Sequence, residues 1–423
     1  MFSRLRWLML HLSRQMWLRA TAFSLLGIFS ALAAVLLKRY IPSELTTRIG
    51  ANAVDSLLSV IASSMLAVTI FSLSTMVAAF ASATSNVTPR STRLLSADST
   101  AQNALATFVG SFIFSVVGII GLHTGLYGDS GRVILYAVTL AVLVLIIVTL
   151  LRWIDYVLKL GRVGPTSARV EKAATKAMRD RYRTPCLGGH RREDALVPPD
   201  MQNVSAGDIG YIDHIDMAEL QELAEDADTT IFVRALPGDL IGPGRPLAMF
   251  TACGRDELTA KIRAAFGVAP QRSFDQDPRF GLCVLAEIAS RALSPAVNDP
   301  GTAIEILARG ARVLAQWAAP CNENMDVDAT IRFSRVHVPP LPLDDLFEDF
   351  FPAIARDGAA NVEVAIQLQK VLQMLASLGE ERYRDAAHTQ SKLALTRNEL
   401  MMPLPGDIER VRAAAARVIG VSG

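Results

Sequence analysis

Small and hydroxylated side chains recur on one side of an apolar segment in the N-terminal half of the chain. At the 100° per residue of an α-helix, eight such residues between positions 56 and 85 share one face. Small residues let two helices pack closely, and weakly polar rings between hydrophobic constrictions can also form the wall of a channel. The sequence therefore predicts either a helix-packing seam or a pore face, built from Ser56, Ser59, Ser63, Ala67, Ser74, Ala78, Ala81 and Ser85.

Polar residues flank this face at both ends of the segment. Asp55 would lie at the outer mouth of a path along the face, and Ser82, Thr84, Asn86 and Thr88 would lie near its inner end. Asp55 also has a structural interpretation, because a carboxylate near the start of a helix is stabilised by the helix dipole. Both interpretations of Asp55 stay open at this stage.

A second group of candidate residues lies in the string ALSPAVNDP, from Ala292 to Pro300. A nucleophilic serine needs a base and an oxyanion donor nearby, and the spacing of the six histidines indicates no such base. Asp299 followed by Pro300 is an N-cap pattern, and Thr302 with Glu305 is a capping box. We predict a structural turn, with an interface or gate contact and catalysis as the alternatives. The residues concerned are Ser294, Pro295, Asn298, Asp299 and Pro300.

No coherent set of catalytic, metal-binding or cofactor-binding residues can be assembled from the sequence. The four cysteines show no spacing typical of a zinc site or redox pair, and His214 would face away from its neighbour Asp213 on a strand. The glycine-rich hairpin from Pro237 to Phe250 resembles those of biotinyl and lipoyl carrier modules, but it has no lysine for attachment. We therefore expect no enzyme activity, no cofactor and no metal, and the net charge of +1 gives no reason to expect nucleic-acid binding.

The pore or packing face belongs to one of four apolar stretches, each near the roughly 20 residues that cross a bilayer as a helix. The fourth contains the uncharged run VILYAVTLAVLVLIIVTLL. The first also fits a secretory signal, but its apolar residues continue to Leu37, which favours an uncleaved helix. We predict a transmembrane domain over 1–160 with four helices at about 20–37, 54–80, 104–122 and 133–154.

Positive charges near the ends of these stretches predict their orientation, since Lys and Arg are retained on the cytoplasmic side. One side has more of them, and we assign it to the cytoplasm together with both chain termini. Its residues are Arg4, Arg6, Arg14, Arg19, Arg90, Arg93, Arg152, Lys159, Arg162, Arg169 and Lys172. The other side carries only Lys38, Arg39, Arg48 and Arg132.

The polar half of the chain predicts a cytosolic α+β region. Residues 161–200 indicate a basic helix and a linker rich in proline and glycine. Residues 201–270 alternate short β-branched runs with one helical pattern, which is typical of a small, β-rich α/β subdomain. Residues 271–423 carry repeated amphipathic patterns and predict a mostly helical domain. The expected fold class is thus a four-helix membrane domain with a cytosolic α+β region and a helical C-terminal part.

Three strings of the sequence resemble a known family. They are FASATSNVTPRSTRLL at Phe80–Leu95, IASRALSPAVNDPGTA at Ile288–Ala303 and VHVPPLPLDDLFEDFF at Val336–Phe351. The chain is similar to an uncharacterised bacterial family of predicted four-helix inner-membrane proteins, catalogued as a domain of unknown function and marked by an ALSPxxNDP signature. The resemblance implies a multi-pass protein of the bacterial inner membrane and implies no activity. Gly301 stands where a bulkier residue is expected in many relatives.

Two functions fit these expectations. The first is an oligomeric channel or transport-related protein, in which the cytosolic region gates the membrane helices and a small ion or solute passes. Small-conductance mechanosensitive channels share only this broad architecture. The alternative is a membrane-anchored scaffold or sensor whose cytosolic domain binds a partner or ligand. The expected partners are the lipid bilayer and further copies of the chain.

Overall fold

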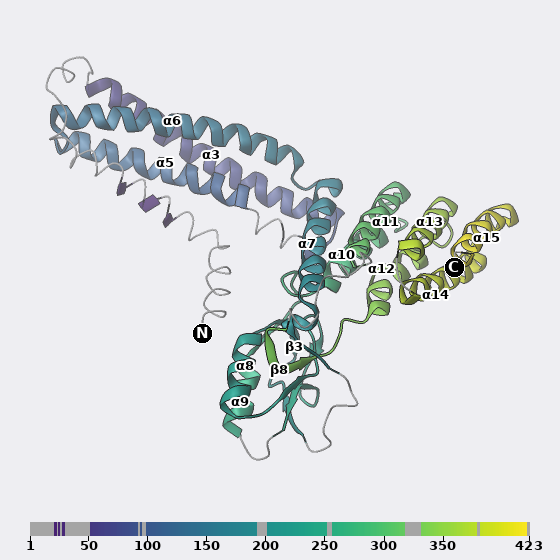
Figure 1. The fold of residues 1–423 in the computed structure, drawn as a ribbon. Coiled ribbons are helices and arrows are strands. Elements are labelled where there is room, and N and C mark those ends of the chain that lie inside the picture. The colour runs from purple at the N-terminus through teal and green to yellow at the C-terminus, as the bar shows by residue number, and fades with distance from the viewer. Residues whose placement is uncertain are drawn as a thin grey trace. The chain divides into compact units, whose positions relative to one another are not determined.

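The fold is seen in a computed structural model of the 423-residue chain (Figure 1). The structure describes residues 51–91, 94, 99–192, 201–251, 256–317, 331–378 and 381–420, with six positions between 21 and 29. The chain forms two compact units, which divide between Thr166 and Ser167.

The first unit is a bundle of long apolar helices. Three of them are long and apolar enough to cross a membrane, over Ala53–Ser82, Ser99–His123 and Gly131–Lys159. These candidate spans overlap three of the four predicted membrane helices, and the predicted helix at 20–37 lies largely outside the described residues. The elements are α3 (Ala51–Asn86), the 3₁₀ turn η3 (Pro89–Ser91), α5 (Ser99–His123) and α6 (Gly128–Lys159).

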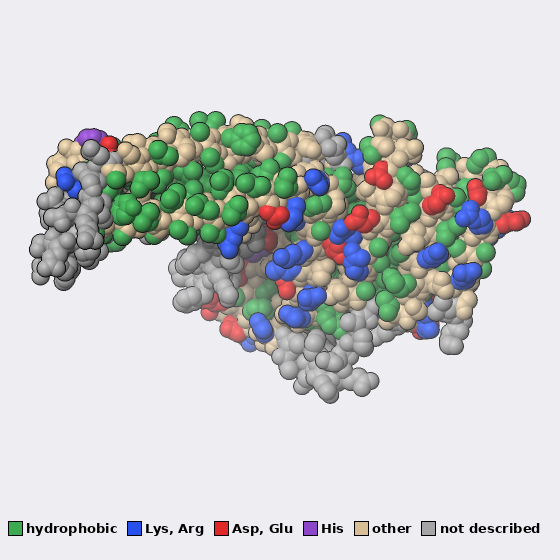
Figure 2. All heavy atoms as spheres, turned by 90° about the horizontal axis from the view of Figure 1, so that it is seen from above, with side chains coloured by type: hydrophobic (Ala, Val, Ile, Leu, Met, Phe, Trp, Pro, Cys, Tyr) green, Lys and Arg blue, Asp and Glu red, His purple; other side chains and the backbone are tan. Residues whose placement is uncertain are grey.

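The core of this unit lies where α3, α5 and α6 face one another (Figure 1). Leu58, Phe108 and Leu135, one from each helix, are fully buried there. Hydrophobic side chains also cover the visible outer surface of the long helices over most of their length (Figure 2). The exposed surface of α6 is built from bulky residues, as expected of a helix that faces lipid. They include Val144, Ile147, Leu151, Ile154 and Leu158.

The second unit contains two small sheets that share a core with two helices. In the five-stranded sheet the order is β1-β8-β4-β6-β2, with β8 parallel to both of its neighbours, and in the three-stranded antiparallel sheet it is β5-β3-β7. Strand β8 comes from beyond residue 271 and β1 from the predicted linker. The strands are β1 (Gly189–Arg191), β2 (Gln202–Ser205), β3 (Gly210–Ile215), β4 (Ile231–Val233), β5 (Leu240–Ile241), β6 (Pro246–Phe250), β7 (Phe266–Ala269) and β8 (Phe333–Val338).

The helices of the second unit follow the predicted amphipathic patterns. Asp216 caps α8 by accepting a hydrogen bond from the backbone N–H of Glu219, and Asn361 caps α13 in the same way. Helices α10 to α15 pack together through buried aromatic and aliphatic side chains (Figure 1). The helices are α7 (Val163–Arg183), α8 (Met217–Asp226), α9 (Asp256–Ala264), α10 (Pro278–Ala292), α11 (Pro300–Ala315), α12 (Leu343–Asp357), α13 (Val362–Leu378), α14 (Glu381–Met401) and α15 (Pro405–Ile419), with the 3₁₀ turn η4 (Pro185–Gly188) after α7.

Candidate functional site

The small-residue face of α3 is exposed in the first unit. Its described side chains are all solvent-accessible, and they lie opposite the face that α3 buries against α5 and α6. At 100° per residue the two faces are about 180° apart. The buried face contains Val54, Leu58, Ile61, Met65, Ser72 and Met76. The exposed face contains Ser56, Ser59, Ser63, Ala67, Ser74, Ala78 and Ala81, and the side chain of Ser85 lies outside the described set.

Two hydroxyl groups on this face are satisfied within the helix. Ser63 donates a 2.9 Å hydrogen bond to the carbonyl oxygen of Ser59, and Ser74 donates a 3.0 Å bond to that of Ile70. Serine bonded in this way presents a weakly polar surface without an unpaired donor. The face is interrupted by bulky groups near its middle, where Ile70 is 60% exposed. The combination of weakly polar and bulky apolar side chains suits a close helix contact or a narrow path.

Asp55 lies at one end of this face, near the start of α3. Its Oδ1 is 3.9 Å from Nε2 of His123, the last residue of α5. This places an ionisable pair at the end of the bundle where α3 begins and α5 ends. The position near the first turn of α3 also agrees with stabilisation of the carboxylate by the helix dipole.

The ALSPAVNDP string forms the connection between α10 and α11. The hydroxyl of Ser294 donates to the carbonyl oxygen of Arg291, and the backbone N–H groups of Val297 and Asn298 both donate to the Ser294 carbonyl. Asn298 adopts φ +49°, a left-handed conformation that asparagine tolerates. Asp299 then caps α11 by accepting from the backbone N–H of Thr302 at 3.0 Å, with Pro300 in the first turn.

These bonds of Ser294 and Asp299 build an exposed turn. The Thr302 hydroxyl also donates to Asp299, and the two hydrogen bonds from Thr302 lower the pKa of this carboxyl group. Of the two possible helix starts, the structure uses Asp299 rather than the Thr302 capping box. Ser290, two residues before the string, donates to the carboxylate of Asp357 and so links α10 to α12.

A buried ionic network at the start of α10 was not predicted. Asp277 caps α10 through the backbone N–H groups of Arg279 and Phe280 and accepts two hydrogen bonds from Arg272, at 2.7 and 3.0 Å. Burial opposes the charge of Arg272, but the paired Asp277 outweighs it and raises the pKa of the guanidinium. Arg279 in turn donates to Asp345 and Asp349 on α12. The pattern Asp277-Pro278 gave a local hint of the helix start, but nothing local indicated the partners.

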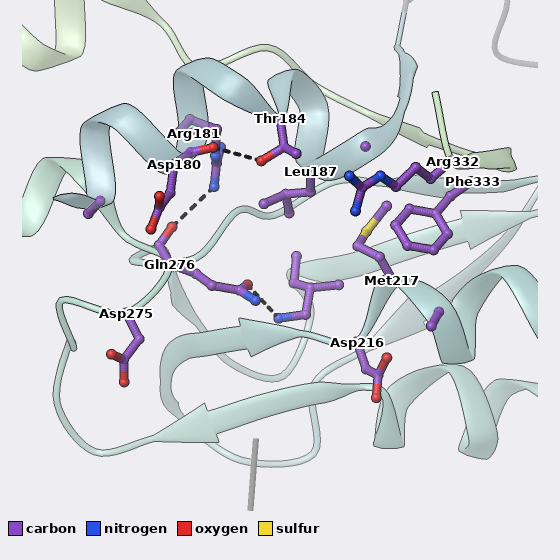
Figure 3. A pocket seen from close by; sticks show the side chains of 14 residues that line it. Asp180, Arg181, Thr184, Leu187, Asp216, Met217, Asp275, Gln276, Arg332 and Phe333 are labelled. Atoms are coloured by element: carbon purple, nitrogen blue, oxygen red, sulfur yellow. Dashed lines mark hydrogen bonds between the residues drawn. The ribbon is translucent and has the colours of Figure 1, made fainter. Parts of the chain in front are cut away.

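A cavity of about 360 Å³ lies beside the C-terminal end of α7 (Figure 3). The buried Arg181 reaches from α7 toward Gln276 and donates a 3.2 Å hydrogen bond to its carbonyl oxygen. Burial lowers the pKa of this guanidinium to about 10. The lining has mixed charge, since Arg181 and Arg332 face three carboxylates, those of Asp180, Asp216 and Asp275. The cavity can accept a small polar molecule but favours neither sign of charge.

Two cysteines can be placed in the structure, and neither forms a disulfide. Burial raises the pKa of the Cys186 thiol, and it raises that of Cys283 to about 12. Both thiols therefore stay protonated at neutral pH and are poor nucleophiles. Cys253 and Cys321 lie outside the described residues.

Comparison with known proteins places this architecture in a family. Residues 13–374 match the family described as predicted membrane protein (DUF2254). The uncharacterized proteins Mb1321c of Mycobacterium bovis and Rv1290c of Mycobacterium tuberculosis are each 27% identical over 338 residues. The aligned region covers 76% of this chain and only 63% of each relative. No solved structure is detectably similar. Because the match extends over most of the sequence and includes all three described membrane helices, the chain belongs to the DUF2254 family of predicted membrane proteins.

Proposed function

We propose that this protein is a subunit of an oligomeric membrane channel, in which copies of the chain meet along the small-residue face of α3. The observation that carries the proposal is the exposure of this face. A helix surface that met only lipid would gain from bulky apolar side chains, as on α6, whereas α3 also turns a row of serines and alanines outward, between exposed bulky residues that include Val60, Ile70 and Val77. Small residues favour contact with another helix, because they let the backbones approach.

The same face supplies a path between the copies. In a closed ring, one α3 helix from each subunit lines the centre, and its serines form weakly polar rings. Asp55 lies at one mouth, and the bulky Ile70, on the same side of α3 as Ser63, forms a hydrophobic constriction near the middle. A small ion or solute is the permeant class that such a narrow path accepts. The proposal includes a multi-pass protein of the bacterial inner membrane with both termini in the cytoplasm.

Adjacent serines provide a matched test of the shared face. Ser63 lies at the centre of the face and Ser64 is turned by about 100° from it. Both are exposed and both bond to a backbone carbonyl of the preceding turn, at 2.9 and 2.6 Å. With each replaced by cysteine in native membranes, oxidation is expected to join Ser63→Cys chains into dimers. Ser64→Cys is expected to show only the background of the native cysteines. Equal cross-linking of the two variants would contradict the shared face.

Bulky substitutions separate a pore from a packing seam. In proteoliposomes, phenylalanine at Ser59, Ser63 or Ser74 is expected to reduce ion flux at least tenfold, because the side chain fills a narrow path. Ser64→Phe serves as the control and is expected to leave flux near the wild-type value. Flux that is unchanged in the three variants would remove the pore, even if cross-linking supports an assembly.

A membrane-anchored sensor is the second candidate function. The observation that favours it is the cavity beside α7, because α7 begins at Val163, four residues after α6 ends at Lys159. A ligand that contacts Arg181 would thus act on the helix that follows the last membrane span. In this case the membrane helices serve as an anchor and no closed ring is required.

A further inference from the structure

A second cleft, in the second unit, is lined by four arginine side chains. Its volume is about 390 Å³, within the range of roughly 300 to 1,000 Å³ that is common for small-molecule sites. It lies between the hairpin that connects β4 to β6 and the proline-rich segment between β8 and α12. The residues that define it are Tyr211, Arg234, Arg245, Arg272, Arg279 and the segment 339–342.

Two of these arginines are held in fixed orientations. Arg279 donates through Nε and Nη2 to Asp349, at 2.6 and 3.2 Å, and through Nη1 to Asp345 at 2.5 Å. A guanidinium has five N–H donors, so these three bonds leave two for a ligand. The side chain is 26% exposed, which makes it accessible from the cleft. Arg272 is oriented in the same way by its two bonds to Asp277. Such fixed donors lose little entropy when an anion binds.

The other two arginines lie at the exposed side of the cleft. Arg245 is anchored by a 2.6 Å hydrogen bond from Nη1 to the carbonyl oxygen of Leu240, and its Nη2 is 3.6 Å from Asp239. The side chain remains 54% exposed. Arg234 follows β4 and is also exposed. The hairpin therefore presents two guanidinium groups toward the same cleft as α10.

The donors of the lining separate this cleft from the cavity beside α7. Four arginines and two carboxylates, Asp239 and Asp345, line the cleft, whereas the cavity beside α7 has two arginines and three carboxylates. Asp277 and Asp349 pair with Arg272 and Arg279 from outside the lining and balance the charge, so the cleft offers an anion guanidinium N–H donors rather than a net positive charge. Guanidinium groups match the geometry of phosphate oxygens and bind them with paired hydrogen bonds.

We propose that this arginine cleft binds a small phosphorylated molecule. Arg234, Arg245 and Arg279 hold its phosphate oxygens, and the organic part lies against Tyr211 and the prolines of the segment 339–342. These prolines have no N–H group and form a rigid apolar wall. The volume favours an organic phosphate over the free ion, since a phosphate alone would leave most of the cleft empty. This inference does not depend on the proposed channel function, because the cleft lies within the second unit.

Calorimetric titration of the full-length protein in detergent at low salt tests the inference. The probes are ADP, inorganic phosphate and adenosine. We expect saturable binding of ADP, weaker binding of phosphate and none of adenosine. The double variant Arg234→Gln/Arg245→Gln is expected to weaken ADP binding at least tenfold. Both side chains are exposed, so its melting temperature without ligand should match that of the wild type.

Arg335→Gln is the matched control, because Arg335 is a half-buried arginine of β8 that pairs with Asp228 and does not line the cleft. It is expected to bind ADP as the wild type does. If inorganic phosphate binds as tightly as ADP, the free ion is the ligand and the organic-phosphate assignment is wrong. The inference is overturned if no probe binds saturably, or if Arg335→Gln weakens binding as much as the double variant.

Discussion

Replacing Asp277 with asparagine is expected to lower the free energy of unfolding of the second unit by about 3 to 5 kcal/mol, which is typical of breaking a buried ion pair. Asparagine can still cap α10, but its amide group cannot neutralise the buried Arg272. Gly238 has φ +96°, and a Cβ there would overlap the Asp277 carboxylate, so the surrounding backbone is fitted to this side chain. The melting temperature, followed by circular dichroism, should fall by on the order of 10 °C.

Asp345→Asn is the control for this prediction. Asp345 is 34% exposed and is one of two carboxylates that pair with Arg279, so Asp349 still neutralises the guanidinium. Exposed ion pairs contribute about 1 kcal/mol or less, and we expect a correspondingly small effect. Equal effects of the two substitutions would show that the buried pair does not stabilise the start of α10.

Replacing Gly310 with alanine is expected to destabilise the helical part by about 2 kcal/mol, although alanine normally favours a helix. A Cβ at this position would overlap the ring of Phe350, which is fully buried and packs against Phe351 with ring centroids 5.0 Å apart. Alanine contributes up to about 1 kcal/mol in helix propensity, whereas overpacking a core costs about 1 to 3 kcal/mol and occasionally more. The midpoint of urea unfolding measures the balance.

Gly301 provides the opposite case in the same helix. A Cβ there would approach only Oδ1 of Asp299, at 3.3 Å, and the position is exposed. Gly301→Ala is therefore expected to be neutral or to stabilise slightly, in agreement with the bulkier residue expected at this position. If Gly310→Ala raised the midpoint as Gly301→Ala does, the close contact between α11 and α12 would be wrong.

The sequence predicted the elements whose pattern is local. Helices α5 and α6 are apolar over a bilayer-spanning length, and the cap of α11 follows from a single residue, Asp299. The spacing of serines on α3 identified a face but not its direction. Only the packing of Leu58 and Met65 on the opposite side shows that this face points outward.

Features that join distant residues could not be predicted. Strand β8 pairs in parallel with β1 and β4, and no periodicity in Phe333–Val338 identifies those partners. The bonds of Arg279 to Asp345 and Asp349 span 66 and 70 positions. The spacing of four between the two aspartates placed them on one helix face, but their partner depends on the tertiary fold. The arginine cleft could not be predicted for the same reason, since its lining comes from separate segments of the second unit.

The mass of the detergent-solubilised complex, measured by native mass spectrometry, tests the proposed assembly most directly. A pore lined by one α3 helix per subunit requires a closed ring of copies. We predict a single defined assembly of three or more 45.7 kDa chains. A monomer or a simple dimer would provide too few helices to enclose a shared path. That result would contradict the channel and favour the membrane-anchored sensor.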